Sequence, residues 1–294
     1  MSVRSRHLLA RYFSAIHWVR KVSVSADRFI IMQIHTWRMD IEYEGTRFSG
    51  WQKQPHSRSI QGEIINAAQN FLGTDVHING SGRTDAGVHA LRQVASLRVK
   101  LGPKAPSIKQ LHAGLNGELP HDINILKIIP VAPAFHPRHD AVSRYYLYQI
   151  ATRRTAFGKP FVWWVRDRLD VSEMARGLNQ ISGRHDFSSF SEFQDNNAST
   201  IVHVHTAEIG TAGGLILIRI GASHFLWKMV RRIVGTIVEI GRGRMTPANF
   251  SRMLETSSNE AAALTAPPSG LFLEQVLYSG DPPPGAIRPA FPIG

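Results

Sequence analysis

Residues 80–89 read Gly80-Ser81-Gly82-Arg83-Thr84-Asp85-Ala86-Gly87-Val88-His89. This glycine-rich turn holds one acid, Asp85, two residues after an arginine, Arg83. Glycines adopt backbone conformations that other residues resist and let another molecule come close, and a nearby guanidinium favours the ionised form of a carboxylate. Turns are also rich in Gly and Asp for conformational reasons alone. The pattern therefore fits either a surface turn capped by Asp85 or a reactive carboxylate.

Strands and helices alternate on both sides of this turn. Met39, Ile41 and Tyr43 alternate with polar residues, which predicts a half-buried strand. Ser59 and Gly73 have the residue types of a helix N-cap and a helix stop, and an apolar stripe at helical spacing lies between them. The same patterns predict strands over 94–99, 123–129, 144–151, 201–209, 215–220 and 271–277, and helices over 107–115, 172–182, 225–240 and from 247 onward.

Each half of the chain thus contains strands and two helices, which predicts an α+β fold. We expect two similar α/β halves with mostly antiparallel sheet, helices on one face and a cleft between the halves. The first half spans 36–140 and includes Asp85, and the second spans 141–279. Residues 1–35 are expected to be an N-terminal extension, either a disordered, transit-peptide-like segment or the product of a mis-called start. The proline-rich residues 280–294 are expected to form a disordered tail.

Composition narrows the function classes. The 294 residues carry 34 Lys and Arg against 22 Asp and Glu, a formal charge of +12. Beyond residue 31, 28 basic residues still face 21 acidic ones, so a polyanionic partner such as a nucleic acid is expected. The absence of cysteine excludes disulfides and thiolate chemistry, and it is consistent with a reducing, cytoplasmic location. No apolar run approaches the roughly 20 residues that span a bilayer, so no membrane partner is expected.

The sequence shows no sign of a metal or a cofactor. Its 14 histidines are scattered and no H-E-x-x-H spacing occurs. No G-x-G-x-x-G follows a predicted strand, and no G-K-[ST] loop is present. We therefore expect neither a metal site nor a nucleotide cofactor.

Two further patterns supply candidate site residues. Tyr146 alternates with its neighbours in the strand over 144–151, where its ring would form part of a cross-strand aromatic ladder or a platform for an unstacked base. Arg231 and Arg232 interrupt the apolar stripe over 225–240. A buried arginine is unfavourable unless it meets an anion, so one of them either extends its head into water or pairs with an internal carboxylate, for which Asp85 is a candidate.

Several blocks of the sequence together resemble the TruA-type tRNA pseudouridine synthases. They follow the family's order over about residues 36–278, and the most specific of them is the block over 82–89. The others are Glu42-Tyr43-Glu44-Gly45, Phe48-Ser49-Gly50-Trp51-Gln52, Leu115-Asn116 with Leu119-Pro120, Phe135-His136-Pro137-Arg138, Gly183-Arg184-His185-Asp186-Phe187, Met229-Val230-Arg231-Arg232-Ile233-Val234-Gly235 and Ala266-Pro267-Pro268-Ser269-Gly270-Leu271-Phe272-Leu273.

The resemblance implies a homodimeric enzyme, without cofactor or metal, whose two α/β halves share one continuous sheet. Its implied partner is tRNA, in which it converts uridine to pseudouridine on the 3′ side of the anticodon stem–loop, at tRNA positions 38–40. By position, Asp85 is the catalytic aspartate, Tyr146 stacks against the target base and Arg231 pairs with the aspartate. Arg83 is expected to contact RNA phosphate, and Leu273 to be an apolar contact near the acid.

Two departures from the family pattern are visible. Trp227-Lys228 replaces two histidines that are common in the family, at a helix position expected to lie near RNA, and residues 200–203 lack a commonly found arginine. We expect both to alter RNA affinity and neither to touch the chemistry.

Alternatives remain open for the mechanism and for the function. Asp85 would act covalently on the sugar or the base, or would remove the C2′ proton of the ribose to give a glycal. A non-catalytic tRNA-binding protein or RNA chaperone of the same fold would share the basic surface but would not need Asp85. A metal-dependent nuclease would need clustered carboxylates.

Overall fold

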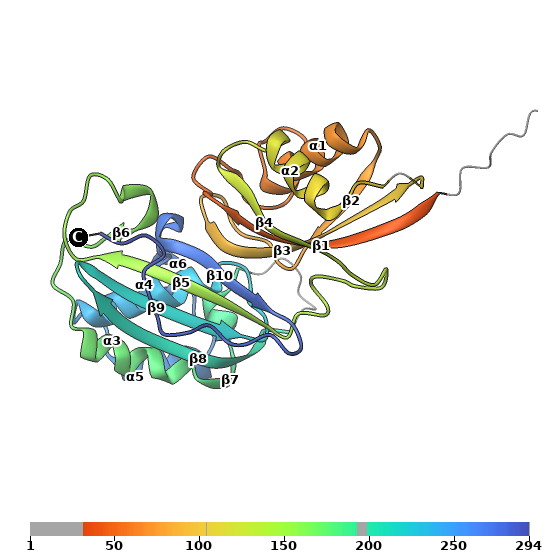
Figure 1. Cartoon of the computed structure of the whole chain (residues 1–294). Helices are drawn as coiled ribbons and strands as arrows, with labels where there is room; N and C mark the ends of the chain where they lie inside the picture. Colours follow the sequence, from red (N-terminus) through yellow and green to blue (C-terminus); the bar gives the residue numbers. More distant parts are fainter. Residues whose placement is uncertain (1–31, 104, 193–198, 294) are drawn as a thin grey trace, which may run out of the picture. The chain divides into compact units, whose positions relative to one another are not determined.

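A ten-stranded sheet runs through the part of the chain that the computed structural model describes, residues 32–103, 105–192 and 199–293 (Figure 1). Its main path is β4-β1-β3-β10-β5-β9-β8-β7, with β2 beside β3 and β6 beside β5. All pairs are antiparallel except β10 with β3 and β5 with β6. The strands are β1 (Gln33–Tyr43), β2 (Val76–Gly80), β3 (His89–Leu101), β4 (Ile123–Pro130), β5 (Ser143–Ala151), β6 (Trp163–Trp164), β7 (Gly183–Asp186), β8 (Ile201–Ala212), β9 (Leu215–Ala222) and β10 (Leu271–Leu277).

The strand β10 joins the two halves into one sheet. It comes from the second half, yet it lies between β3 of the first half and β5 of the second. The expected shared, mostly antiparallel sheet is therefore confirmed. The strand β1 begins at Gln33, so the end of the expected N-terminal extension belongs to the sheet, while residues 1–31 lie outside the described residues.

The described α-helices are α1 (Ile60–Leu72), α2 (Ile108–Glu118), α3 (Val171–Leu178), α4 (Met229–Gly241), α5 (Pro247–Glu255) and α6 (Glu260–Ala263). Side chains cap the first turn of α1, α2, α3 and α5. The Ser59 side chain accepts a hydrogen bond from the backbone of α1, and Gly73 ends that helix with a φ of +65°. The sequence favoured Ser172 as the N-cap of α3, but the carboxylate of Asp170 caps the helix instead, two residues earlier. The helix therefore begins at Val171, and its regular part is shorter than the predicted stretch. None of the described helices is long and apolar enough to cross a membrane.

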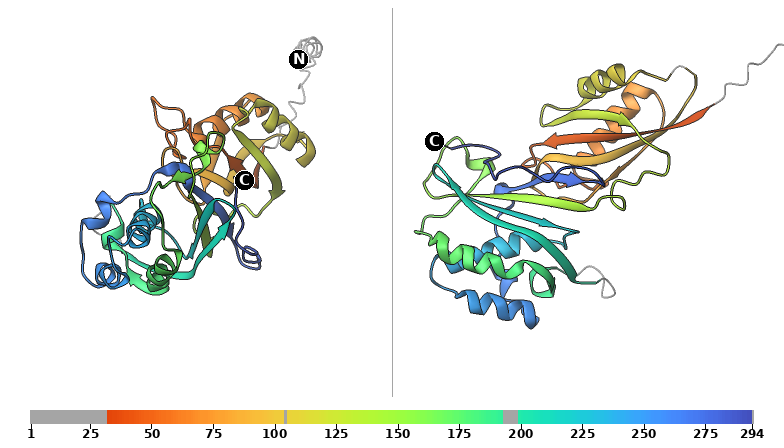
Figure 2. Two further views of the ribbon diagram at one scale, coloured as in Figure 1. Left: turned by 90° about the vertical axis from the view of Figure 1, so that its left-hand side faces the viewer. Right: turned by 60° about the horizontal axis from the view of Figure 1, so that its bottom comes forward.

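The helices of both halves pack on the same face of the sheet, as expected. On β5, Tyr148 belongs to the core cluster that contains buried residues of α3 and α4. Leu273 of β10 belongs to the cluster that contains buried residues of α1 and α2, and Tyr146 packs against both clusters. The intervening residue Leu147 belongs to a third cluster on the opposite face. Because the sheet twists along its length, this one face points toward different sides at its two ends (Figure 2).

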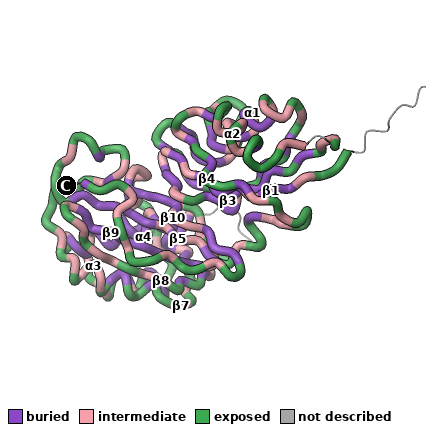
Figure 3. The backbone as a smooth tube through the Cα atoms, in the orientation of Figure 1, coloured by how far each residue is buried: buried purple, intermediate pink, exposed green. Residues whose placement is uncertain are grey.

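The C-terminal tail covers the opposite face of the sheet. The backbone N–H groups of Ala290 and Phe291 donate to the side-chain oxygen of Gln149, at 2.7 and 3.2 Å, and Ile293 is buried. Every residue of β9 is buried, consistent with cover on both faces (Figure 3). The expectation of a disordered tail is thus wrong for residues 280–293, because the sheet offers this segment hydrogen bonds and apolar cover.

Candidate active site

The turn between β2 and β3 carries Asp85 and is held by the segment that follows β1. The backbone N–H of Trp51 donates to the carbonyl of Thr84 at 3.1 Å, and the hydroxyls of Thr84 and Tyr43 lie 2.8 Å apart. Gly50 has a φ of +93°, and a Cβ there would lie 2.5 Å from the carbonyl oxygen of Thr84. Only glycine permits both the conformation and the approach. The motif blocks near residues 50 and 85 are therefore parts of one structural unit.

Side chains from two strands fix the start of the same turn. Gln93 of β3 donates to the carbonyl of Gly82 at 3.1 Å and accepts from the hydroxyl of Ser81 at 2.6 Å. Arg144 of β5 donates to the carbonyl of Ser81 at 3.1 Å. The second half of the chain thus orients the turn that carries Asp85.

Two side chains of the second half hold the carboxylate of Asp85. Nη1 of Arg231 lies 3.1 Å from Oδ2, and Nε1 of Trp227 donates to Oδ1 at 3.1 Å. A second nitrogen of the same guanidinium, Nε, donates to the carbonyl of Ala266 at 2.7 Å. The Asp85 side chain is 23% exposed and that of Arg231 is 14% exposed. The structure thus combines a charge partner for the carboxylate with access from outside.

Tyr146 lies on β5 close to this carboxylate. Its half-buried ring packs edge-on against Phe225, with centroids 4.9 Å apart and an interplanar angle of 82°. Burial raises the pKa of the Tyr146 hydroxyl, and the nearby Tyr43 and the charge of Asp85 raise it further. The hydroxyl therefore stays protonated at neutral pH, so the side chain offers a neutral ring and no base.

The remaining two predicted site residues differ in their surroundings. Leu273 of β10 is buried opposite Tyr146 in the sheet and supports it from the neighbouring strand. Arg83 is exposed in the same turn as Asp85, and it makes no hydrogen bond or ion pair with any residue that the structure describes. Its guanidinium is thus available to an anion outside the chain.

Comparisons with known proteins identify the family of this chain. The sequence profile of a family described as tRNA pseudouridine synthase matches residues 40–140 and 178–279, more than half of the chain. Proteins named tRNA pseudouridine synthase A from Pelobacter propionicus and Myxococcus xanthus are 37% and 36% identical to it over 247 and 249 residues. These alignments cover 83% and 84% of this chain and 100% and 93% of those proteins. The chain belongs to the tRNA pseudouridine synthase family. It is therefore an isomerase, as the resemblance predicted.

One departure of this pseudouridine synthase from the family pattern lies at the site itself. The sequence suggested that Trp227 sits in a helix, and this expectation is wrong. The helix α4 begins at Met229, because Lys228 adopts a left-handed conformation with a φ of +62° and interrupts the helical path. Trp227 precedes this interruption and contacts Asp85. Phe225, expected in the same helix, instead packs on Tyr146.

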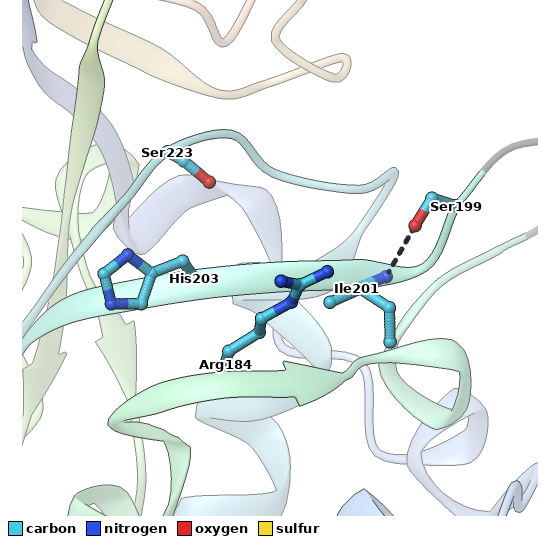
Figure 4. Close-up of a pocket in the computed structure, with 5 residues that line it drawn as sticks. All are labelled: Arg184, Ser199, Ile201, His203 and Ser223. Carbon is cyan, nitrogen blue, oxygen red and sulfur yellow. Dashed lines mark hydrogen bonds between the residues drawn. The ribbon is translucent and has the colours of Figure 1, made fainter.

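The second departure lies at a pocket of this synthase. The pocket has a volume of about 440 Å³ and is lined by Arg184, Ser199, Ile201, His203 and Ser223 (Figure 4). Arg184 of β7 is exposed and lies opposite His203 of β8 in the strand register. A guanidinium therefore stands beside the segment over 200–203 that lacks the family's arginine.

His89, the last residue of the signature block, has a structural environment in this pseudouridine synthase. It is 1% exposed; its Nδ1 accepts from the backbone of Gly45 at 3.0 Å, and its Nε2 lies 3.0 Å from the carbonyl of Pro160. These partners require a neutral ring protonated at Nε2, because a carbonyl can only accept. Burial lowers the pKa of His89, outweighing the opposite effect of Glu44.

We predict that His89 makes the fold sensitive to acid. Between the lowered pKa of His89 in the folded protein and the ordinary value of 6.5, the unfolded chain binds more protons than the folded one. The contribution of neutral His89 to the free energy of unfolding is therefore complete above this pH range and declines as the pH falls through it. His89→Gln should lower the free energy of unfolding at pH 7.5 and reduce the further loss at pH 5.5. Urea titrations at both values, with the exposed His77→Gln on β2 as control, measure this. An equal pH dependence in wild type and His89→Gln would contradict it.

Proposed function

We propose that this enzyme uses Asp85 to isomerise uridines in the anticodon stem–loop of tRNA, at positions 38–40, as a cytoplasmic homodimer. The family and its named relatives support the reaction and the tRNA substrate. The observation that carries the role of Asp85 is its carboxylate, bound at 3.1 Å by Arg231 from the other half of the chain and still partly exposed. The exposed Arg83 beside it supports binding of an RNA phosphate.

The reaction rearranges bonds within one nucleotide. The bond between N1 and C1′ breaks, the base turns, and C5 bonds to C1′; C5 then loses its proton and N1 gains one. In a covalent route an oxygen of Asp85 bonds to C1′ as N1 leaves and is released when C5 attacks. In a glycal route the same oxygen removes the C2′ proton and later returns it. Both routes begin with an ionised carboxylate, and Arg231 places a guanidinium nitrogen 3.1 Å from one of its oxygens.

The target base must leave its stack to reach Asp85. Enzymes that act on a base extrude it at a cost of a few kcal/mol, least where the base is unpaired. An aromatic ring that receives the base offsets part of this cost, by about 1–3 kcal/mol. Tyr146 is the neutral ring beside Asp85 and serves as this platform in our proposal.

Variants of Tyr146 separate its ring from its hydroxyl. Tyr146→Phe should keep most of the activity, because the ring remains and the hydroxyl acts as no base. Tyr146→Ala should lower kcat/KM by roughly 5- to 150-fold, the equivalent of one stacked base. Initial rates on a tRNA transcript measure both, with thermal melting to compare stability. An equal loss in the two variants would show that stacking is not the main role of Tyr146.

Mapping the product tests the function as a whole. A tRNA transcript is incubated with the enzyme, and pseudouridines are located by carbodiimide modification and primer extension. Pseudouridine should appear only on the 3′ side of the anticodon stem–loop. Product in another part of the tRNA would overturn the site preference. A protein that binds the transcript without forming pseudouridine would fit the alternative of a non-catalytic tRNA-binding protein.

A further inference from the structure

We propose that Trp227 is a positioning residue for Asp85, which holds one oxygen of the carboxylate through its indole N–H. This inference rests on the proposed catalytic role of Asp85. It concerns how this chain orients the carboxylate.

Arg231 alone leaves the carboxylate free to turn. Nη1 of Arg231 bonds to one oxygen of Asp85, whereas Nε of Arg231 bonds to the carbonyl of Ala266. A carboxylate held at a single oxygen can rotate about that contact, whereas a planar two-point contact fixes it. The indole of Trp227 supplies the second point, at the other oxygen and at an equal distance of 3.1 Å. The two donors together define the plane of the carboxylate and leave its remaining lone pairs for substrate.

Contacts to both the backbone and the ring of Trp227 hold this residue in place. Lys228, which follows it, is the one non-glycine residue with a positive φ among those described. Such a conformation is unfavourable for lysine and persists only when the surroundings enforce it. Here Nζ of Lys228 lies 4.7 Å from the centre of the indole and pairs with the carboxylate of Glu192. The backbone N–H of Glu192 donates to the carbonyl of Trp227 at 3.2 Å.

Contacts to its neighbours, more than burial, fix the indole of Trp227. Trp227 is 39% exposed, so burial of apolar surface alone does not fix its ring. The strained turn, the ammonium over the ring and the bond from Glu192 fix it instead. Their common effect is to point the indole N–H at Asp85.

Three variants test the role of the indole N–H. Trp227→Phe keeps an aromatic ring and loses the donor, Trp227→His restores a ring N–H, and Trp164→Phe is a control at an exposed tryptophan of β6. The full-length enzyme and a tRNA transcript are used, with single-turnover rates and tRNA Kd as readouts. Trp227→Phe should lower the rate about tenfold, as expected for a lost hydrogen bond to a charged group. Its Kd should stay within about threefold of wild type, Trp227→His should recover part of the rate, and Trp164→Phe should match wild type.

Other outcomes overturn the proposal. A wild-type rate in Trp227→Phe would do so, as would a loss confined to Kd that Trp227→His does not relieve. A measurement on the free enzyme does not depend on the folding of a Trp227 variant. The indole 1H–15N signal of Trp227, assigned in the wild-type enzyme, should move in Asp85→Asn, and an unchanged signal would overturn the contact. An active Asp85→Asn enzyme would instead refute the proposed role of Asp85 itself.

Discussion

Asp85→Asn is expected to reduce pseudouridine formation by about 10⁴-fold or more while leaving tRNA affinity within about threefold of wild type. Asparagine keeps the shape of the side chain, and its oxygen can still accept a hydrogen bond from Arg231 or Trp227. It carries no charge and is neither a useful nucleophile nor a base, so both routes to product stop at their first step. Tritium release from tRNA labelled at C5 of uridine measures turnover, and filter binding measures affinity.

A second aspartate provides the control for this experiment. Asp75 is exposed, accepts a hydrogen bond from Gln69 and precedes β2, outside the motif turn, so Asp75→Asn should leave turnover unchanged. Near-normal turnover in Asp85→Asn would remove Asp85 from the chemistry. Loss of affinity in Asp85→Asn equal to its loss of turnover would assign the residue to binding.

Local patterns predicted most elements of this fold but not their neighbours in the sheet. Ser59 and Gly73 end α1 as their side-chain and backbone chemistry requires. Nothing in the local sequence of residues 271–277 says that this strand lies between β3 and β5. Strand pairing depends on contacts between residues far apart in the chain, which a local period does not encode.

The candidate site could be predicted from the sequence only in part. An arginine inside an apolar stripe needs an anion, and this requirement makes Asp85 a candidate partner for Arg231 on the sequence alone. Trp227 was hidden, because residues 225–240 follow one helical period and a left-handed lysine has no sequence signature. The tail shows the limit of composition: prolines predicted disorder, whereas Gln149 and the open face of the sheet hold residues 290–293 in place.

Arg231→Leu is the change with the second-largest expected effect. The leucine retains apolar volume on α4 but removes the cation and hydrogen-bond donor that contacts the carboxylate of Asp85 at 3.1 Å. Loss of one well-placed donor in an active site lowers kcat by about 10²- to 10³-fold, and we expect a fall in this range. Arg231→Lys should retain more activity than Arg231→Leu, because it keeps the charge. The exposed Arg252→Leu on α5 controls for loss of positive charge alone.

The backbone around Arg231 makes this prediction specific to the guanidinium. Gly235 lets α4 approach the following segment so closely that a Cβ there would lie 1.5 Å from the carbonyl oxygen of Leu264. The N–H of Ala266 then donates to the carbonyl of Arg231 at 3.0 Å, which anchors the helix whatever side chain stands at that position. Arg231→Leu should therefore fold with α4 in place, and circular dichroism and thermal melting can establish this. A folded Arg231→Leu enzyme with kcat within about threefold of wild type would show that Asp85 needs no cationic partner.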